Sequence, residues 1–213
     1  MPLVQVLRVT GLSKAYAGRS VLRDVDLGVE AGEVAALLGP NGTGKTTLLG
    51  CVTGAVIADS GRVEIGGHDL AAAPLAARAA LRALPQEVEV PEGLTGREIV
   101  EFFSQVFADP QGQSRVIELA DLGPAIDALA TTYSVGMRKR LMFAALMLGE
   151  CRLFALDEPF AGIDRPGRAR MVAALARACA AGAGVLLSAH DEEDLAGLGL
   201  PVRGVRLADS RGA

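Results

Sequence analysis

The chain has 213 residues, enough for one large domain or for one domain with an inserted lobe. Half of the residues are hydrophobic, with much alanine, and only 4% are aromatic, so the composition predicts a folded α/β protein with Ala-rich helices and argues against disorder. The formal net charge is −4, and this lack of a basic excess argues against nucleic acid as a partner.

The chain shows no signal for export or for membrane insertion. Residues 1–8 contain no long apolar run, so no signal peptide is expected. The longest charge-free apolar stretches, residues 141–148 and 178–189, are well short of the roughly 20 residues that a membrane helix needs. The 3 cysteines lie far apart without a CxxC spacing, which predicts reduced thiols in a cytosolic protein and no zinc site.

In the first part of the chain, apolar patterns predict strands interrupted by two helices. Strands are expected at residues 4–9, 21–29, 34–38 and 62–65. Helices are expected at residues 45–52 and 74–82, followed by an edge of the core sheet at 83–85. The run at 34–38 is apolar throughout, which is typical of a strand buried on both faces of a parallel sheet.

From residue 88 to about 149 strand patterns vanish and helical patterns replace them. Helices are expected at residues 96–107, 113–122 and 135–148. Strands resume at 152–156, 184–188 and 202–207, separated by expected helices at 166–181 and 191–198. Strand–helix–strand alternation favours a parallel sheet with right-handed crossovers. We therefore predict an α/β domain with a helical lobe inserted at about residues 88–149.

A glycine-rich segment directly after the strand at 34–38 matches the pattern G-x-x-x-x-G-K-[ST]. Its residues, called the P-loop below, are Gly39, Pro40, Asn41, Gly42, Thr43, Gly44, Lys45 and Thr46. Glycines let such a loop curl so that backbone N–H groups point at phosphate oxygens, and the helix after it adds its positive dipole end. Lys45 can reach the β- and γ-phosphates, and the Thr46 hydroxyl can ligate Mg²⁺. The P-loop thus predicts a site for ATP and Mg²⁺.

Two adjacent carboxylates, Asp157 and Glu158, follow the apolar run at 153–156. Acids at the carboxyl end of a buried strand fit the crevice in which open α/β sheets bind ligands. Asp157 is placed to hold Mg²⁺, directly or through a water molecule. Because neighbouring residues of a strand alternate sides, Glu158 is expected to point elsewhere and to orient or deprotonate the attacking water.

With these motifs in this order, the chain resembles the ABC-type ATPases, the nucleotide-binding subunits of ABC transporters, over residues 3–207. The family's signature, usually Leu-Ser-Gly-Gly-Gln, is similar to the segment at residues 133–137, in which Ser134 and Gly136 match while Val135 and Met137 depart. A serine and a glycine supply a hydroxyl and a close backbone approach at a helix N-terminus. The resemblance implies that both residues contact ATP bound to a second subunit.

The resemblance assigns further roles, each to a residue at the matching position. Tyr16 resembles the aromatic residue that stacks on adenine, and Thr47 follows the P-loop where the family also contacts the nucleotide. Gln86 resembles the glutamine that touches the metal, the water and the membrane partner. Asp164 lies in a segment (161–164) that resembles the D-loop, which passes between two subunits, and His190 resembles the histidine that contacts the γ-phosphate.

For the fold, the resemblance implies a P-loop NTPase core with a mixed, mostly parallel sheet, an N-terminal antiparallel β subdomain and an inserted α-helical lobe. One domain would then span residues 1–213, with the core at 1–87 and 150–213. For the function, it implies an ATPase whose cofactors are ATP and Mg²⁺ and whose partners are a separate transmembrane permease and a second ATPase subunit in a C₂ homodimer. The flank at 133–140 is similar to exporter-type ATPases. The implied location is cytoplasmic, peripheral to the inner face of the cell membrane.

Two other functions remain open from the sequence. A soluble ABC-type ATPase acting on DNA or ribosomes usually carries long coiled coils or two tandem cassettes, and neither pattern is found here. An assembly module that binds ATP without useful turnover is disfavoured because Lys45, Asp157, Glu158 and His190 are all in place.

Overall fold

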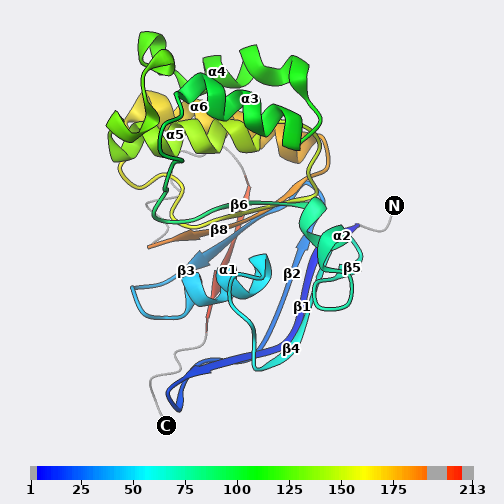
Figure 1. Ribbon diagram of the computed structural model, residues 1–213. Coiled ribbons are helices and arrows are strands. Elements are labelled where there is room, and N and C mark those ends of the chain that lie inside the picture. The colour runs from blue at the N-terminus through cyan, green and yellow to red at the C-terminus, as the bar shows by residue number, and fades with distance from the viewer. Residues whose placement is uncertain (1–3, 191–200, 208–213) are drawn as a thin grey trace. The chain divides into compact units, whose positions relative to one another are not determined.

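The computed structural model describes residues 4–190 and 201–207 (Figure 1). The expected helix at 191–198 lies outside the described residues. The strands are β1 (Gln5–Tyr16), β2 (Arg19–Glu30), β3 (Val34–Leu38), β4 (Ser60–Ile65), β5 (His68–Asp69), β6 (Leu81–Leu84), β7 (Leu153–Leu156), β8 (Gly184–Ala189) and β9 (Val202–Arg206). The α-helices are α1 (Lys45–Thr53), α2 (Pro74–Ala79), α3 (Gly96–Val106), α4 (Gln113–Ala120), α5 (Val135–Leu146) and α6 (Arg165–Ala180).

The chain divides into two compact units. The first unit comprises Met1–Ala83, Cys151–Glu158 and Ala178–Ala213, and the second comprises Leu84–Glu150 and Pro159–Arg177. The second unit thus contains the predicted lobe together with most of α6. The single-domain assignment and the lobe boundaries at about 88 and 149 stay predictions.

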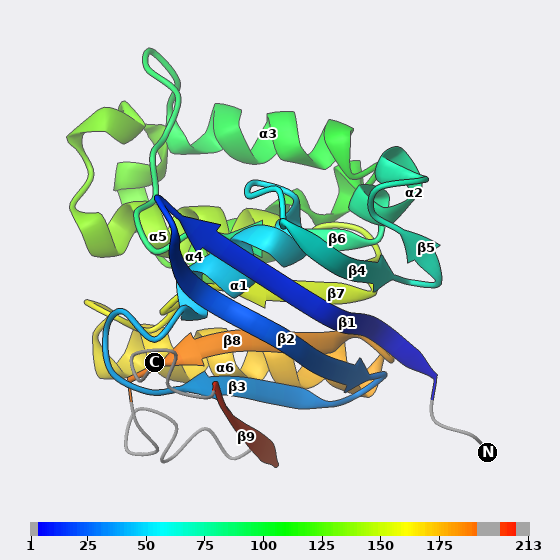
Figure 2. The same cartoon turned by 90° about the horizontal axis from the view of Figure 1, so that it is seen from below.

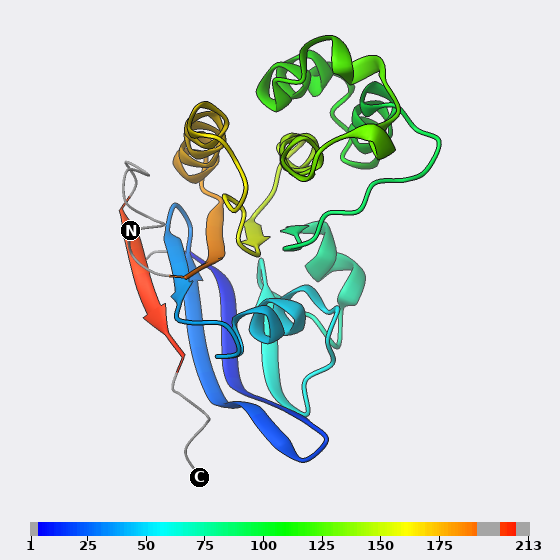
Figure 3. The same ribbon diagram turned by 90° about the vertical axis from the view of Figure 1, so that its left-hand side faces the viewer.

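Two sheets form the framework of the described chain. One has the order β2-β1-β4-β5, and all of its strand pairs are antiparallel. The other has the order β6-β7-β8-β3-β9, and β8 pairs in parallel with β7 and β3 while β9 pairs in parallel with β3 at the edge (Figure 3). The predicted fold, a largely parallel sheet with an N-terminal antiparallel sheet and helices, is confirmed.

The hairpin of β1 and β2 is longer than the apolar pattern predicted. β1 was expected to end at Val9 but continues to Tyr16, and β2 runs beside it (Figure 2). The pairing of β1 with β2 shifts register between Val9 and Leu12, where Gly11 has a φ of 60°. Such an irregularity breaks the period-2 alternation of side chains, so the sequence pattern stops although the strand does not.

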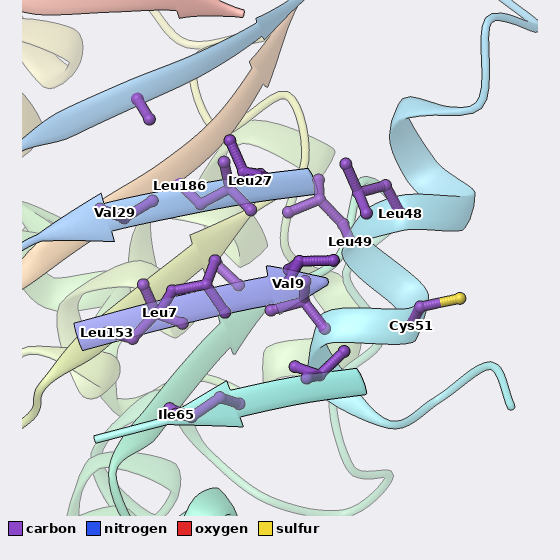
Figure 4. Close-up of a cluster of buried hydrophobic side chains, with 14 of the residues drawn as sticks. Leu7, Val9, Leu27, Val29, Leu48, Leu49, Cys51, Ile65, Leu153 and Leu186 are labelled. Atoms are coloured by element: carbon purple, nitrogen blue, oxygen red, sulfur yellow. The ribbon is translucent and has the colours of Figure 1, made fainter. Parts of the chain in front are cut away.

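The core of the first unit lies between α1 and strands of both sheets. Buried side chains of α1, including Leu48 and Leu49, belong to one cluster with Leu7 of β1, Leu153 of β7 and Leu186 of β8 (Figure 4). Fully burying a Leu or Val side chain stabilises a fold by about 1.5–3 kcal/mol. This packing fixes the start of α1, and therefore the P-loop, against both sheets.

The predicted helix at 74–82 is too long. Helix α2 ends at Ala79, and Arg82 lies in strand β6. The Arg82 side chain is buried, and its guanidinium donates to the carbonyl oxygens of Ala79 (3.2 Å) and Leu81 (3.1 Å). The sequence pattern placed Arg82 on the surface of a helix and therefore did not predict that its side chain is buried.

All three cysteines are free thiols, as expected. Burial raises the pKa of the Cys151 thiol to about 11.

Helices α3, α4 and α5 pack against one another in the second unit (Figure 1). Helix α3 begins with a capping box, in which Thr95 accepts from the N–H of Glu98 and the Glu98 carboxylate accepts from the N–H of Thr95. This arrangement satisfies two N–H groups at the helix start. The Tyr133 ring is buried, and its hydroxyl donates to the carbonyl oxygen of Ala125 at 2.5 Å. That bond fixes the chain immediately before the signature helix α5.

Candidate functional site

The P-loop connects a buried strand to a helix, as predicted. All five residues of β3 are buried, and α1 begins at Lys45. Gly39, Gly42 and Gly44 have φ values of 143°, 81° and 98°, a region that favours glycine. Gly44 is the N-cap of α1 and no side chain caps this helix start, so its first N–H groups are available to an anion.

Lys45 lies inside the curl of the P-loop. It is buried, and its Nζ donates to the carbonyl oxygens of Gly39 and Pro40. The Thr43 hydroxyl also donates to the Pro40 carbonyl oxygen, at 3.0 Å. The Thr46 side chain, one residue into α1, is exposed. In P-loop proteins, a lysine ammonium next to the N-terminus of this helix binds the β- and γ-phosphates of a nucleotide.

Gly44 of the P-loop has little room for a side chain. A Cβ there would lie 3.0 Å from the Leu22 side chain and 3.1 Å from the Val21 carbonyl oxygen, at a φ of +98°. Gly44→Ala is expected to lower the free energy of unfolding by about 2–3 kcal/mol, because strain and crowding add. The matched control is Gly67→Ala, where φ is +83° but nothing lies within 4 Å, and only about 1 kcal/mol of strain is expected. Urea unfolding measures both, and equal losses would contradict the crowding.

Three adjacent parallel strands carry the predicted catalytic motifs at their carboxyl ends. β3 pairs with β8 so that Leu38 lies beside Ala189, and β7 pairs with β8 so that Leu156 lies beside Leu187. The P-loop follows β3, the two carboxylates follow β7, and His190 follows β8. Ligands of open α/β sheets bind outside the carboxyl ends of the strands. Strand pairing therefore brings motifs from distant parts of the sequence to one edge of one sheet.

The two carboxylates have different surroundings. Asp157 is buried, and its Oδ1 accepts a hydrogen bond from the Ser188 hydroxyl at 2.5 Å. Glu158 is half-buried, and its Oε1 lies 3.3 Å from Nε2 of His190, which is exposed. The structure therefore brings Asp157, Glu158 and His190 together, and Ser188 bonds to the first two.

The sequence analysis expected Asp157 and Glu158 to point to different sides because strand residues alternate, and this reason is wrong. β7 ends at Leu156, so neither Asp157 nor Glu158 lies within the strand, and the alternation of strand side chains does not apply. Instead, Glu158 has a φ of 44°, which turns the backbone out of the strand direction. Its N–H donates to the Ser188 hydroxyl oxygen at 2.9 Å, which holds this left-handed conformation.

Ser188 is a site residue that the sequence reading missed. It is the one polar residue in the run 185–189 of β8, and it is buried while bonding to both acidic residues. This single hydroxyl in an otherwise apolar strand is the sequence feature by which Ser188 could have been recognised. Ser188→Ala is expected to lower kcat of ATP hydrolysis about tenfold. It should also lower the free energy of unfolding by about 1–3 kcal/mol, because the buried Asp157 carboxylate loses its donor and the Glu158 N–H loses its acceptor.

A second buried serine offers the control for Ser188. The Ser104 hydroxyl of α3 donates to the Glu101 carbonyl oxygen at 2.7 Å and accepts from the Gln113 amide at 2.7 Å. Ser104→Ala should lower stability by a similar amount and leave kcat unchanged. An unchanged kcat in Ser188→Ala, measured in steady-state assays, would contradict a role for Ser188 in the site.

The remaining predicted residues of the first unit include Tyr16 and Thr47. Tyr16 is the last residue of β1 and is 48% exposed, and Thr47 lies partly buried in the first turn of α1. In the second unit, Gln86 is exposed and lies two residues beyond β6. Their contacts with nucleotide or metal stay predictions.

The signature helix and the D-loop segment meet within the second unit. Ser134 is the N-cap of α5, and its hydroxyl accepts from the Met137 N–H at 3.2 Å. A Cβ at Gly136 would lie 3.0 Å from the carbonyl oxygen of Gly162, so glycine permits a close approach to the D-loop. Lys139, which is buried, donates to the carbonyl oxygen of Ala161 at 3.3 Å.

Asp164 begins the next helix. Its Oδ1 accepts from the Gly167 N–H at 3.2 Å, and this side chain therefore caps the start of α6. The signature residues and Asp164 thus occupy neighbouring helix starts in one unit. Their predicted contacts with ATP of a second subunit stay predictions.

Comparison with known proteins identifies the class. A family model described as ABC transporter matches residues 22–161. A probable ABC transporter ATP-binding protein of Azorhizobium caulinodans is 36% identical over 90% of this chain and 71% of its own length. The lipopolysaccharide export ATP-binding protein LptB of Escherichia coli is 34% identical, over 87% of this chain and 80% of its own. The daunorubicin/doxorubicin resistance ATP-binding protein DrrA of Streptomyces peucetius is 35% identical, over 89% and 60%.

A solved structure, described as that of an ATP binding subunit of an ABC transporter, matches with a TM-score of 0.87 and 28% identity, over 96% of this chain and 87% of that one. The chain belongs to the ABC transporter family. Within that family it is an ATP-binding subunit and an ATPase, of the kind that pairs with membrane permease components. No helix in the described parts of this chain is long and apolar enough to cross a membrane.

Proposed function

We propose that this chain hydrolyses ATP at a site shared between two copies and thereby drives a separate permease that exports its substrate. The observation that carries the proposal is the meeting of three motifs at one sheet edge: the P-loop after β3, Asp157 and Glu158 after β7, and His190 after β8. In this assignment the P-loop and Thr47 hold the phosphates, and Tyr16 stacks on the base. Glu158 acts as the base toward water, while His190 and Gln86 contact the reacting phosphate and the water.

The residues proposed to hold the metal carry oxygen donors, which suit Mg²⁺. In the first unit, Thr46 offers an exposed hydroxyl, and Asp157 offers a carboxylate that already accepts a hydrogen bond from Ser188. In the second unit, Gln86 offers an amide oxygen. Mg²⁺ prefers oxygen ligands and is usually held by one or two protein groups together with phosphate oxygens and water. Bound there, Mg²⁺ would neutralise phosphate charge.

The shared site is proposed from the position of Ser134 and Gly136. Both lie at the start of α5 in the second unit, whereas the P-loop lies in the first. In the family, a signature of this kind caps ATP bound to the P-loop of the other subunit. Two such contacts related by a twofold axis would make a C₂ homodimer with two ATP molecules at its interface. ATP then favours the closed pair because it contacts both copies only in that state.

Export is proposed from two kinds of relative. LptB is named for lipopolysaccharide export, and DrrA is named for daunorubicin/doxorubicin resistance. We infer a permease on a separate chain, which would place this subunit at the cytoplasmic face of the membrane. The acidic net charge of −4 argues against nucleic acid as the partner.

The partner is tested by affinity purification of the full chain, co-expressed with the multi-span membrane protein encoded beside it. Co-purification of the two, with ATPase activity stimulated in the complex, is the expected result. Recovery of ribosomes or DNA after nuclease-controlled washing would favour the soluble alternative and contradict the transporter. A chain with Lys45→Ala serves to separate partner binding from nucleotide binding.

A further inference from the structure

Tyr16, the residue expected to meet the nucleotide base, is the last residue of β1, which forms a hairpin with β2 (Figure 3). It pairs with Arg19 across a two-residue turn, in which Ala17 and Gly18 have φ values of 48° and 79°. Positive φ at both central residues is typical of a type I′ turn, whose twist matches that of the flanking strands. The turn fixes the backbone of Tyr16 from its carboxyl side.

One residue, Asp59, fixes Tyr16 from the amino side. Its Oδ1 accepts from Lys14 Nζ at 2.8 Å, its Oδ2 accepts from the Ala15 N–H at 2.7 Å, and its own N–H donates to the Ser13 carbonyl oxygen at 2.9 Å. The pairing of β1 with β4 ends at Ser13. Asp59 therefore takes over from the strand pairing and holds the last residues of β1 up to Tyr16.

Lys14 connects this carboxylate to the tyrosine ring. Its Nζ lies 5.3 Å from the centroid of the Tyr16 ring, within the range of a cation–π contact. The hydrogen bond with Asp59 raises the pKa of Lys14, and the same bond lowers the pKa of Asp59, so both groups are charged at neutral pH. With the ammonium over one face of the ring, a base would stack on the opposite face.

We propose that Asp59 and Lys14 are positioning residues for the base of the bound nucleotide, and that they act through the Tyr16 ring. The inference rests on the proposed function in two respects, namely that the P-loop binds the phosphates of this nucleotide and that Tyr16 stacks on its base. A ring that is already held in its stacking position loses little freedom on binding, and this preorganisation improves affinity. Asp59 itself touches neither the base nor the phosphates in this scheme.

The test compares binding of ADP and pyrophosphate, both with Mg²⁺, to the full chain by calorimetry, with competition titrations for weak binding. Neither ligand is hydrolysed, and only ADP carries a base. Tyr16→Ala is expected to weaken ADP binding about tenfold, since stacking on an aromatic ring contributes on this order. Asp59→Ala and Lys14→Met are each expected to weaken it about threefold through a less ordered ring. Pyrophosphate binding should be unchanged in all three variants.

The decisive comparison is the double variant. If Asp59 acts through Tyr16, then Tyr16→Ala combined with Asp59→Ala binds ADP no more weakly than Tyr16→Ala alone. Additive losses, unchanged ADP binding in Asp59→Ala, or equal losses for ADP and pyrophosphate would each overturn the proposal.

A matched control separates positioning from stability. Asp69 also accepts from two backbone N–H groups, those of Ala71 and Ala72, and pairs with Arg62 at 2.6 Å. Asp69→Ala should lower Tm like Asp59→Ala without changing the ratio of ADP to pyrophosphate affinity. The P-loop itself is tested apart by Lys45→Ala, which should weaken both ligands. Retention of both by that variant would reject the proposed function, whatever Asp59 does.

Discussion

Glu158→Gln is expected to lower kcat of ATP hydrolysis by about 10²- to 10⁴-fold, the range that general base catalysis supplies. The amide has nearly the same shape as the carboxylate, so the contact with His190 and the turn held by Ser188 can persist. What the amide loses is the ability to take a proton from the attacking water. Binding of ATP should therefore remain, and the defect should lie in kcat and not in Kd.

Steady-state assays and a direct ATP-binding titration measure the two quantities. Glu101→Gln, an exposed position on α3, is the control and should match the unmodified chain in both. A Glu158→Gln chain that retains more than about a tenth of kcat would show that another group accepts the proton.

Lys45→Ala is expected to weaken ATP binding about a hundredfold or more, because the charged group proposed to bind the phosphates is removed from a buried setting. The buried ammonium donates hydrogen bonds to the carbonyl oxygens of Gly39 and Pro40, so its removal should also destabilise the P-loop. A titration with ATP–Mg²⁺ measures the affinity, and thermal unfolding without nucleotide shows how much of the effect is structural.

Lys45→Arg separates charge from shape. It keeps the positive charge but replaces a compact ammonium by a planar guanidinium, so an intermediate loss is expected. If Lys45→Ala bound ATP as tightly as the unmodified chain, the phosphates would lie elsewhere.

The sequence predicted the framework well where local pattern and tertiary role agree. β3 has the predicted bounds, because an apolar run between a turn and a P-loop leaves little choice. The P-loop and the helix after it follow from backbone chemistry that only glycines permit at φ values such as the 98° of Gly44. A parallel sheet also predicts that Asp157, Glu158 and His190 lie close together, because all three follow the carboxyl ends of neighbouring strands.

Other features depend on contacts that no local pattern encodes. The full length of β1 could not be predicted because a register shift near Gly11 interrupts its apolar pattern. The strand that contains Arg82 could not be predicted because the buried side chain is a charged one. The role of Ser188 requires knowing that β7 and β8 are neighbours. The hold of Asp59 on the residues before Tyr16 joins positions more than 40 apart in the chain.

The central claim, that ATP is bound between two copies of this chain, is tested most directly by the mass of the Glu158→Gln chain in solution. Size-exclusion chromatography with light scattering should show a monomer without nucleotide and a dimer with saturating ATP–Mg²⁺, because the bound ATP is not hydrolysed. Adding Ser134→Arg to this variant should restore the monomer, since the contact from the second copy is blocked. A Glu158→Gln chain that stays monomeric while a titration shows ATP bound would contradict the shared site.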